Sequence, residues 1–212
     1  MGAEPVFVDV SHTSLGLCPI ATESWLAEHH ALLSRPSLEV VAVKSAELKK
    51  ISLHPTPNQA IAIVTPKTFA LDKAILQNDI SLFLDGIQDP GNLGTIIRTA
   101  DWFNFNKILC SLSCVDVFNP KVVQATMGSL ARVNIYYADL VPILKQTKLP
   151  IYGTLLNGES IFNTNFDDKG YLIFGNEGNG ISEEMISLIT KSVTIPGGKN
   201  TESLNVAISV FR

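Results

Sequence analysis

The sequence has few cysteines and histidines and no long apolar run, and each shortage argues against a class of protein. Its three cysteines form no CxxC pair, so neither a disulfide framework nor a zinc site is indicated. The four histidines show no ligand spacing, and no metal is expected. No stretch approaches the roughly 20 apolar residues of a membrane helix, and residues 1–10 lack the features of a signal peptide. We therefore expect reduced thiols, no membrane partner and a cytoplasmic location.

The balance of apolar and charged residues is that of an ordinary globular α/β protein. The 212 residues are 46% hydrophobic and 17% charged, which is enough for one large or two small domains with a substantial core. The net charge of −4 gives no general attraction to a polyanion, so RNA binding would need a local basic patch. Residues that could form one, or could equally be solvated surface charges, are Arg35, Lys44, Lys49, Lys50, Lys107, Lys121 and Arg132.

Strands and helices alternate along residues 80–212. Continuous apolar stretches separated by helical patterns predict an open parallel sheet with helices on both faces. The expected strands are 80–84, 108–111, 133–136, 151–155, 171–174 and 192–195, and the expected helices are 94–105, 120–130, 140–146, 183–189 and one that begins at Ser203.

The first 65 residues have a separate pattern. It predicts a helix over 23–33, a strand over 38–43, a helix over 45–51 capped by Ser45 and a strand over 60–64. We expect a small α/β domain over 1–65, a linker over 66–79 with a helical turn at 71–76, and a second domain over 80–212.

Three polar, glycine-rich segments occur in the second domain. They read DGIQDPGNLGTIIRTA at 85–100, FGNEGNGIS at 174–182 and IPGGKNTESLNVA at 195–207. Backbone N–H groups in such loops are free to hold a small polar ligand. In this order the segments resemble the three signature motifs of the SpoU/TrmH family of RNA ribose 2′-O-methyltransferases, in the SPOUT superfamily, over roughly residues 80 to 208.

The resemblance implies a fold, an activity and partners. It implies a C-terminal trefoil knot, which no hydrophobic pattern predicts because knots are close to absent among folds. It implies methyl transfer from S-adenosylmethionine to a ribose 2′-hydroxyl in tRNA or rRNA, by a homodimer without a metal. Residues 20–64 resemble the later half of a small RNA-binding domain that often precedes the catalytic domain in this family, through ATESW at 21–25 and ELKKIS at 47–52. The usual opening of that domain is not recognisable in residues 1–17.

The resemblance also implies site residues. Arg98 is the family's catalytic arginine, with two possible roles. One is that of a proton acceptor; the other, which agrees better with a guanidinium that stays protonated, is to hold a substrate phosphate and stabilise the developing alkoxide. The alternatives are an exposed helix arginine without such a role, or a salt bridge at the end of the sheet with Asp101 or Asp85. The full catalytic set is Asn92, Arg98, Glu177, Ser203 and Asn205, and the cofactor set is Thr154, Leu155, Gly175, Asn176, Gly180, Ile195, Pro196, Ser203 and Leu204.

Three other functions are alternatives to this one. A catalytically silent RNA-binding or ribosome-assembly protein with the same fold would have no need of the intact polar set. A nucleotide-binding oxidoreductase would show GxGxxG in its first βαβ unit with an acidic residue about 20 residues later, and this chain has no such pattern. A base-methylating SPOUT enzyme is disfavoured by the three motifs.

Overall fold

A computed structural model describes residues 6–9, 44–52, 61–64, 70–197 and 204–210. The chain divides into two compact units, Met1–Lys67 and Thr68–Arg212. The expected helix over 23–33 and strand over 38–43 lie outside the described residues, as do Ser203 and most of the third glycine-rich segment.

The described part of the first unit contains two strands and one helix. Strand β1 (Val6–Asp9) pairs antiparallel with β2 (Ile61–Val64). Helix α3 (Ser45–Ile51) has the predicted bounds. Its cap is Lys44 and not Ser45, and the backbone N–H of Lys44 donates to Glu47 Oε2 at 2.7 Å. The sequence pattern predicted α3 and β2 but not β1.

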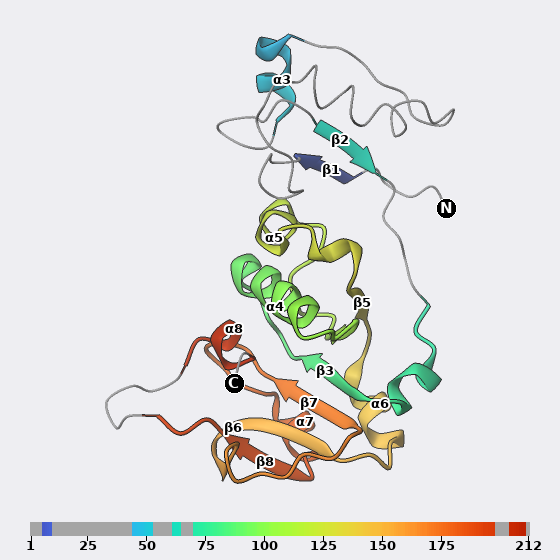
Figure 1. The fold of residues 1–212 in the computed structure, drawn as a ribbon, viewed down its shortest axis with the longest axis vertical. Helices are drawn as coiled ribbons and strands as arrows, with labels where there is room; N and C mark the ends of the chain where they lie inside the picture. The colour runs from blue at the N-terminus through green and yellow to red at the C-terminus, as the bar shows by residue number, and fades with distance from the viewer. Residues whose placement is uncertain (1–5, 10–43, 53–60, 65–69, 198–203, 211–212) are drawn as a thin grey trace. The chain divides into compact units, whose positions relative to one another are not determined.

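The second unit is built on a six-stranded sheet in the order β5-β4-β3-β7-β6-β8, and every neighbouring pair is parallel (Figure 1). This confirms the predicted parallel sheet. The strands are β3 (Ile80–Leu84), β4 (Lys107–Cys110), β5 (Asn134–Tyr137), β6 (Ile151–Ser160), β7 (Gly170–Phe174) and β8 (Lys191–Thr194).

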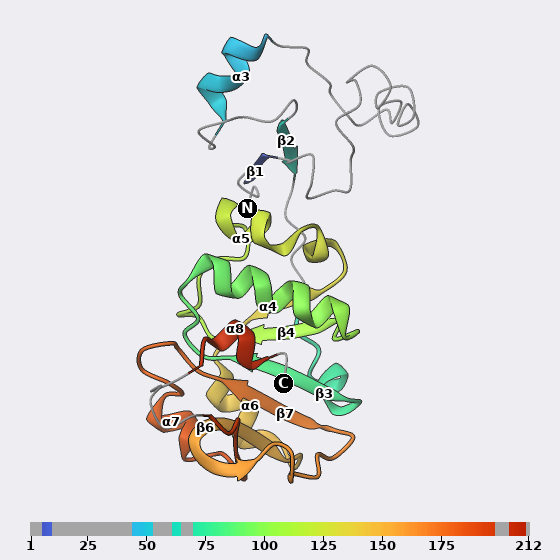
Figure 2. The same ribbon diagram turned by 60° about the vertical axis from the view of Figure 1, so that its left-hand side comes forward.

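Helices cover both faces of this sheet. The second unit contains α4 (Pro90–Trp102), α5 (Pro120–Thr126), α6 (Leu140–Gln146), α7 (Glu183–Ile186), α8 (Val206–Ser209) and the 3₁₀ helices η1 (Lys73–Gln77) and η2 (Ser129–Ala131). One buried cluster joins α4, α5 and α8 to the sheet, and a second joins η1, α6 and α7 to the opposite face. In Figure 2, α4 runs along the sheet beside β4, and α8 lies on the same face. Among the described residues, no helix is long and apolar enough to cross a membrane.

Helix ends differ from the predicted ones where local capping decides. Helix α4 begins at Pro90 and not at residue 94, because Asp89 caps it by accepting from the N–H of Asn92 at 2.7 Å. Helix α5 ends early because Met127 and Gly128 both adopt positive φ. Helix α8 begins at Val206, one residue after Asn205, which caps it instead of lying within it.

The expected linker over 66–79 carries a core residue. The turn predicted at 71–76 is the 3₁₀ helix η1. Leu76 within it is fully buried in the cluster between the sheet and helices α6 and α7. The predicted knot depends on the course of the chain from Ile195 to Asn205. Residues 198–203 of that stretch are outside the described residues, so the knot stays an expectation from the resemblance.

Candidate active site at the carboxyl edge of the sheet

Three segments meet where the parallel strands end. The arrowheads of β3, β7 and β8 point to the same side of the molecule, where α8 also lies (Figure 1). The loop 85–89 follows β3, the loop 175–180 follows β7, and Ile195 follows β8. Open α/β sheets bind their ligands outside the carboxyl ends of the strands. This edge is therefore where chemistry is expected.

A chain of side-chain hydrogen bonds joins these segments. Asn205 Oδ1 accepts from the backbone N–H groups of Ala207 and Ile208 at 3.0 and 3.3 Å, which leaves its Nδ2 to donate to Asn92 Oδ1 at 3.0 Å. Asn92 Nδ2 then donates to Glu177 Oε1 at 2.7 Å. Which way each side-chain amide turns its oxygen and its nitrogen is set by the preceding hydrogen bond in this chain, beginning with the N–H groups in the first turn of α8. Three of the five predicted catalytic residues thus form one network.

The loop 175–180 is narrow and closed on itself. Asn176 and Gly180 exchange backbone hydrogen bonds at 2.9 and 2.8 Å, and Gly180 has a φ of 70° that favours glycine. Gly175 packs so closely on Gly180 that a side chain there would meet the backbone. The Asn176 side chain binds within the loop and to the carbonyl of Gly86. Helix α7 and not a strand follows, as predicted.

Arg98 does not take part in the network. It is exposed on α4, and within the described residues it makes no ion pair or side-chain hydrogen bond. Its expected alternative partners are otherwise engaged. Asp101 pairs with Arg132 at 2.6 Å, and Asp85 Oδ2 accepts from the N–H of Ser182 at 2.8 Å. The ion-pair alternative for Arg98 is therefore wrong. Its exposure agrees with the alternative of an exposed helix arginine, and its catalytic role stays a prediction.

The predicted cofactor residues supply apolar surface and backbone groups at the strand ends. Leu155 and Ile195 are half-buried, Pro196 is exposed and Leu204 is 45% exposed. Thr154 is also half-buried, and its hydroxyl donates to the carbonyl of Ile173 at 2.9 Å. Accessible aliphatic side chains beside backbone amides fit the adenosyl part of S-adenosylmethionine. Their assignment to that ligand stays a prediction.

Sequence reasoning missed residues that hold the loop after β3. Ser111, which directly follows β4, accepts from the N–H of Gly86 at 2.9 Å through its hydroxyl. Gly86 has a φ of 67°. Asp85 is buried, and by accepting from the N–H of Ser182 it fixes the chain where it leaves the loop 175–180. The available signal was Asp-Gly directly after one buried strand and Ser directly after the next.

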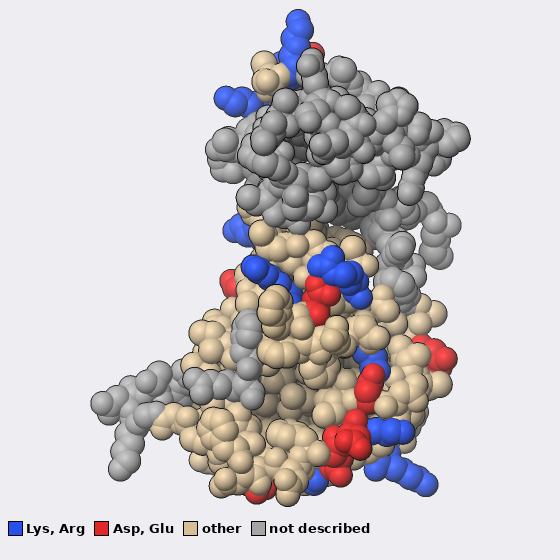
Figure 3. Space-filling model, viewed as in Figure 1, with Lys and Arg blue, Asp and Glu red and all other residues tan. Residues whose placement is uncertain are grey.

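Two of the residues that could have formed a basic patch are engaged in ion pairs. Lys107 is buried, pairs with Asp79 and donates to the carbonyl of Ile75 at 2.8 Å. Arg132 is held by Asp101. On the face shown in Figure 3, most of the described surface is neutral, and Lys and Arg stand beside Asp and Glu in small groups. The described residues on this face give no continuous basic patch.

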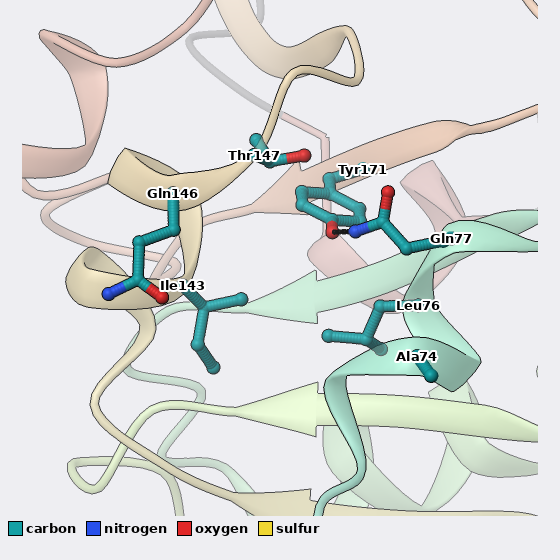
Figure 4. Close-up of a pocket in the computed structure, with 7 residues that line it drawn as sticks. All are labelled: Ala74, Leu76, Gln77, Ile143, Gln146, Thr147 and Tyr171. Atoms are coloured by element: carbon teal, nitrogen blue, oxygen red, sulfur yellow. Dashed lines mark hydrogen bonds between the residues drawn. The ribbon is translucent and has the colours of Figure 1, made fainter.

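Two hollows lie at the opposite, amino edge of the sheet. One of about 270 Å³ lies between η1 and α6, where the Gln77 amide donates to the Tyr171 hydroxyl at 3.2 Å (Figure 4). The other, of about 240 Å³, lies beside the ion pair of Lys107 with Asp79. Neither includes a predicted site residue. They are separate from the network at the carboxyl edge.

The fold and network define an α/β protein whose polar site lies at the carboxyl edge of an open parallel sheet. The model of the SpoU rRNA Methylase family matches residues 79–211. The chain belongs to this family.

Similar proteins agree with this assignment. The chain is 32% identical over 197 residues to an uncharacterized tRNA/rRNA methyltransferase of Synechocystis sp., covering 89% of this chain and 72% of that protein. It is 34% identical over 132 residues to the 23S rRNA (guanosine(2553)-2′-O)-methyltransferase RlmP of Bacillus subtilis, covering 60% of this chain and 53% of RlmP. An AdoMet-bound rRNA methyltransferase from Sinorhizobium meliloti superposes with a TM-score of 0.77 at 28% identity, covering 88% of this chain and 74% of that one.

These findings confirm the predicted family, the α/β fold, the methyltransferase class and S-adenosylmethionine as the cofactor of that class. The silent RNA-binding alternative is not favoured by them.

Proposed function

We propose that the network at the carboxyl edge is the active site of an S-adenosylmethionine-dependent 2′-O-methyltransferase that acts on ribosomal or transfer RNA. The observation that carries this proposal is the hydrogen-bonded chain from Asn205 through Asn92 to Glu177. It gathers one residue from each of three segments far apart in the sequence, and it ends on a carboxylate. The family and its rRNA-modifying members support RNA as the substrate.

The residues of the chain orient the acceptor. When bound, S-adenosylmethionine supplies a methyl group on a positively charged sulfur. Glu177 uses Oε1 for Asn92, and within the described residues its Oε2 has no hydrogen-bond partner, so this oxygen is available to a ribose hydroxyl. Because Asn92 and Asn205 hold the carboxylate in place, it need not reorganise as the hydroxyl loses its proton.

Arg98 contributes charge and not a base. Arginine side chains act in proteins as cations and not as bases, and Arg98 is exposed on the helix that carries Asn92. A protonated, exposed guanidinium suits a phosphate of the RNA, and it stabilises the alkoxide that develops on the 2′-oxygen. The leaving proton then passes to a phosphate oxygen or to solvent.

The working protein is proposed to be a cytoplasmic homodimer. The resemblance to the SpoU/TrmH family motivates both statements. Sedimentation of the full chain gives the oligomeric state directly, and a monomer that is fully active would contradict the dimer.

Transfer of labelled methyl to RNA tests the proposed function. The protein is incubated with radiolabelled S-adenosylmethionine and rRNA fragments or bulk tRNA. Label should appear on ribose and leave a linkage that resists alkaline cleavage, because a methylated 2′-oxygen cannot attack the neighbouring phosphate. A substrate with a 2′-deoxy sugar at the target should accept no label. Label on a base would contradict the proposal, and RNA binding without any transfer would favour the silent RNA-binding alternative.

A further inference from the structure

Asn176 uses its side chain inside the protein. Its Oδ1 accepts from the backbone N–H groups of Gly178 at 2.9 Å and Asn179 at 3.0 Å, and its Nδ2 donates to the carbonyl of Gly86 at 2.7 Å. An asparagine amide offers two acceptor and two donor positions. Three of the four are occupied, so one N–H remains for any ligand.

Gly86 is held from two sides by these contacts. Its carbonyl accepts from Asn176, and its N–H donates to Ser111 Oγ at 2.9 Å. The left-handed conformation of Gly86 is costly for other residues, and a Cβ there would stand 3.7 Å from the Cβ of Asn176. The peptide groups on both sides of Gly86 therefore have one fixed orientation.

Two links then join the loop after β7 to the chain after β3. Asn176 binds Gly86, and the next residue, Glu177, binds Asn92. Gly86 leads through Asp89, which caps α4, to Asn92 in the first turn of that helix. Two successive residues of one loop thus hold both ends of the same short segment. Such a double link fixes direction as well as distance, and it adds to the bond that Ser182, just after the loop, donates through its N–H to Asp85.

We infer that Asn176 is a positioning residue for methyl transfer, which acts through Glu177 and Asn92, and not the cofactor contact that the resemblance implied. This inference rests on the proposed function for its effect on turnover. The contacts that it names are independent of which reaction the site performs.

Substitutions at Asn176 separate the two roles. Asn176→Ala removes all three bonds, whereas Asn176→Asp keeps the acceptors for Gly178 and Asn179 and replaces the donor to Gly86 with a repelling oxygen. Asn179→Ala is the matched control, since Asn179 is exposed and its side chain has no hydrogen bond to any described residue. All variants are made in the full chain, and thermal melting verifies that each is as fully folded as the original protein before they are compared.

Turnover and cofactor binding should respond differently. Because small misplacements of reacting groups cost up to about 100-fold in rate, we expect kcat to fall by about 10- to 100-fold in both Asn176 variants. We expect the Kd for S-adenosylmethionine, measured by calorimetry, to stay within about 3-fold of the original, since a residue that acts only on the chemical step leaves ground-state binding unchanged. Asn179→Ala should leave both quantities unchanged.

Amide hydrogen exchange supplies a readout that does not depend on activity. Exchange at Gly178 and Asn179 should accelerate in Asn176→Ala and stay slow in Asn176→Asp. A double-mutant cycle on kcat with Ser111→Ala should be non-additive, because both side chains hold Gly86.

Three results would overturn the inference. The first is a rise of more than about 10-fold in the cofactor Kd of the Asn176 variants with kcat preserved at saturation. The second is unchanged amide exchange at Gly178 and Asn179 in Asn176→Ala. The third is that the effects of the Asn176 and Ser111 substitutions on kcat are additive. If the unaltered protein transfers no methyl group, the proposed function fails, and the exchange data alone decide whether Asn176 fixes the loop.

Discussion

Asn205 combines a structural and a chemical task, and two substitutions should separate them. Its Oδ1 caps α8 through Ala207 and Ile208, while its Nδ2 donates to Asn92. Asn205→Ala removes both interactions. Asn205→Asp keeps the capping oxygen, because Asp caps helices as well as Asn and its charge suits a helix N-terminus. It loses only the donor to Asn92.

The energies can be worked from these contacts. Losing the cap costs about 1 kcal/mol, and the hydrogen bond to Asn92, which is partly exposed to water, adds roughly 0.5–1.5 kcal/mol. For a domain of this size each kcal/mol lowers Tm by about 2–4 °C. Asn205→Ala should therefore melt roughly 3–10 °C lower. Asn205→Asp should lose only the roughly 0.5–1.5 kcal/mol of the exposed bond to Asn92, since it keeps the cap.

Activity should fall in both variants. In Asn205→Asp a carboxylate oxygen faces Asn92 Oδ1, which was 3.0 Å from the lost donor. If Asn92 rotates its amide to donate to Asp, its own oxygen turns toward Glu177, so no orientation satisfies all three groups. Thermal melting and labelled-methyl transfer test this pair. Full activity in Asn205→Asp, or equal destabilisation by the two variants, would refute the inferred directions of the hydrogen bonds from Asn205 through Asn92 to Glu177.

Three further predictions address the donor pocket, the helix interface and a thiol. Arg98→Ala should abolish methyl transfer while calorimetry shows cofactor binding nearly intact, and Leu204→Arg should weaken cofactor binding; equal loss of affinity in both would contradict this division of roles. Gly94→Ala should destabilise the domain by about 1–3 kcal/mol through overpacking, because a Cβ there would meet Ala125 and lie 2.9 Å from the carbonyl oxygen of Val122. This cost should exceed the gain of about 1 kcal/mol from the higher helix propensity of Ala. A higher melting temperature would contradict the close α4–α5 contact. Hydrogen bonds from the Cys110 thiol and the Ser111 hydroxyl lower the pKa of Cys114 to about 7, against the opposing effect of burial. Alkylation of Cys114, followed by mass spectrometry with Cys114→Ser as control, should therefore accelerate as the pH rises through 7. Acceleration only above about 8.5, the ordinary cysteine value, would show that these bonds are absent.

Much of the second unit was predictable because its signals are local. Strand β3 and helix α6 have the predicted bounds, since a buried parallel strand is a continuous apolar stretch and an Asp cap starts a helix at a definite residue. Helix α5 begins as predicted at Pro120, with Asn119 accepting from the N–H of Lys121 at 2.9 Å. Its early end was not predictable, because Met127 takes a positive φ, a conformation that a methionine rarely adopts and that no local pattern indicates.

The sequence by itself determined the family, the order of strands and helices and the residue types of the site, because each is written in short motifs and local periodicity. Only the tertiary structure decided which of those residues touch. It joined Asn92, Glu177 and Asn205 across the edge of the sheet, left Arg98 exposed outside that network and directed the side chain of Asn176 into the protein. The physical reason is that hydrogen bonds between loops depend on strand order, which no local pattern encodes: β7 lies beside β3 although some 85 residues separate the loops that follow them.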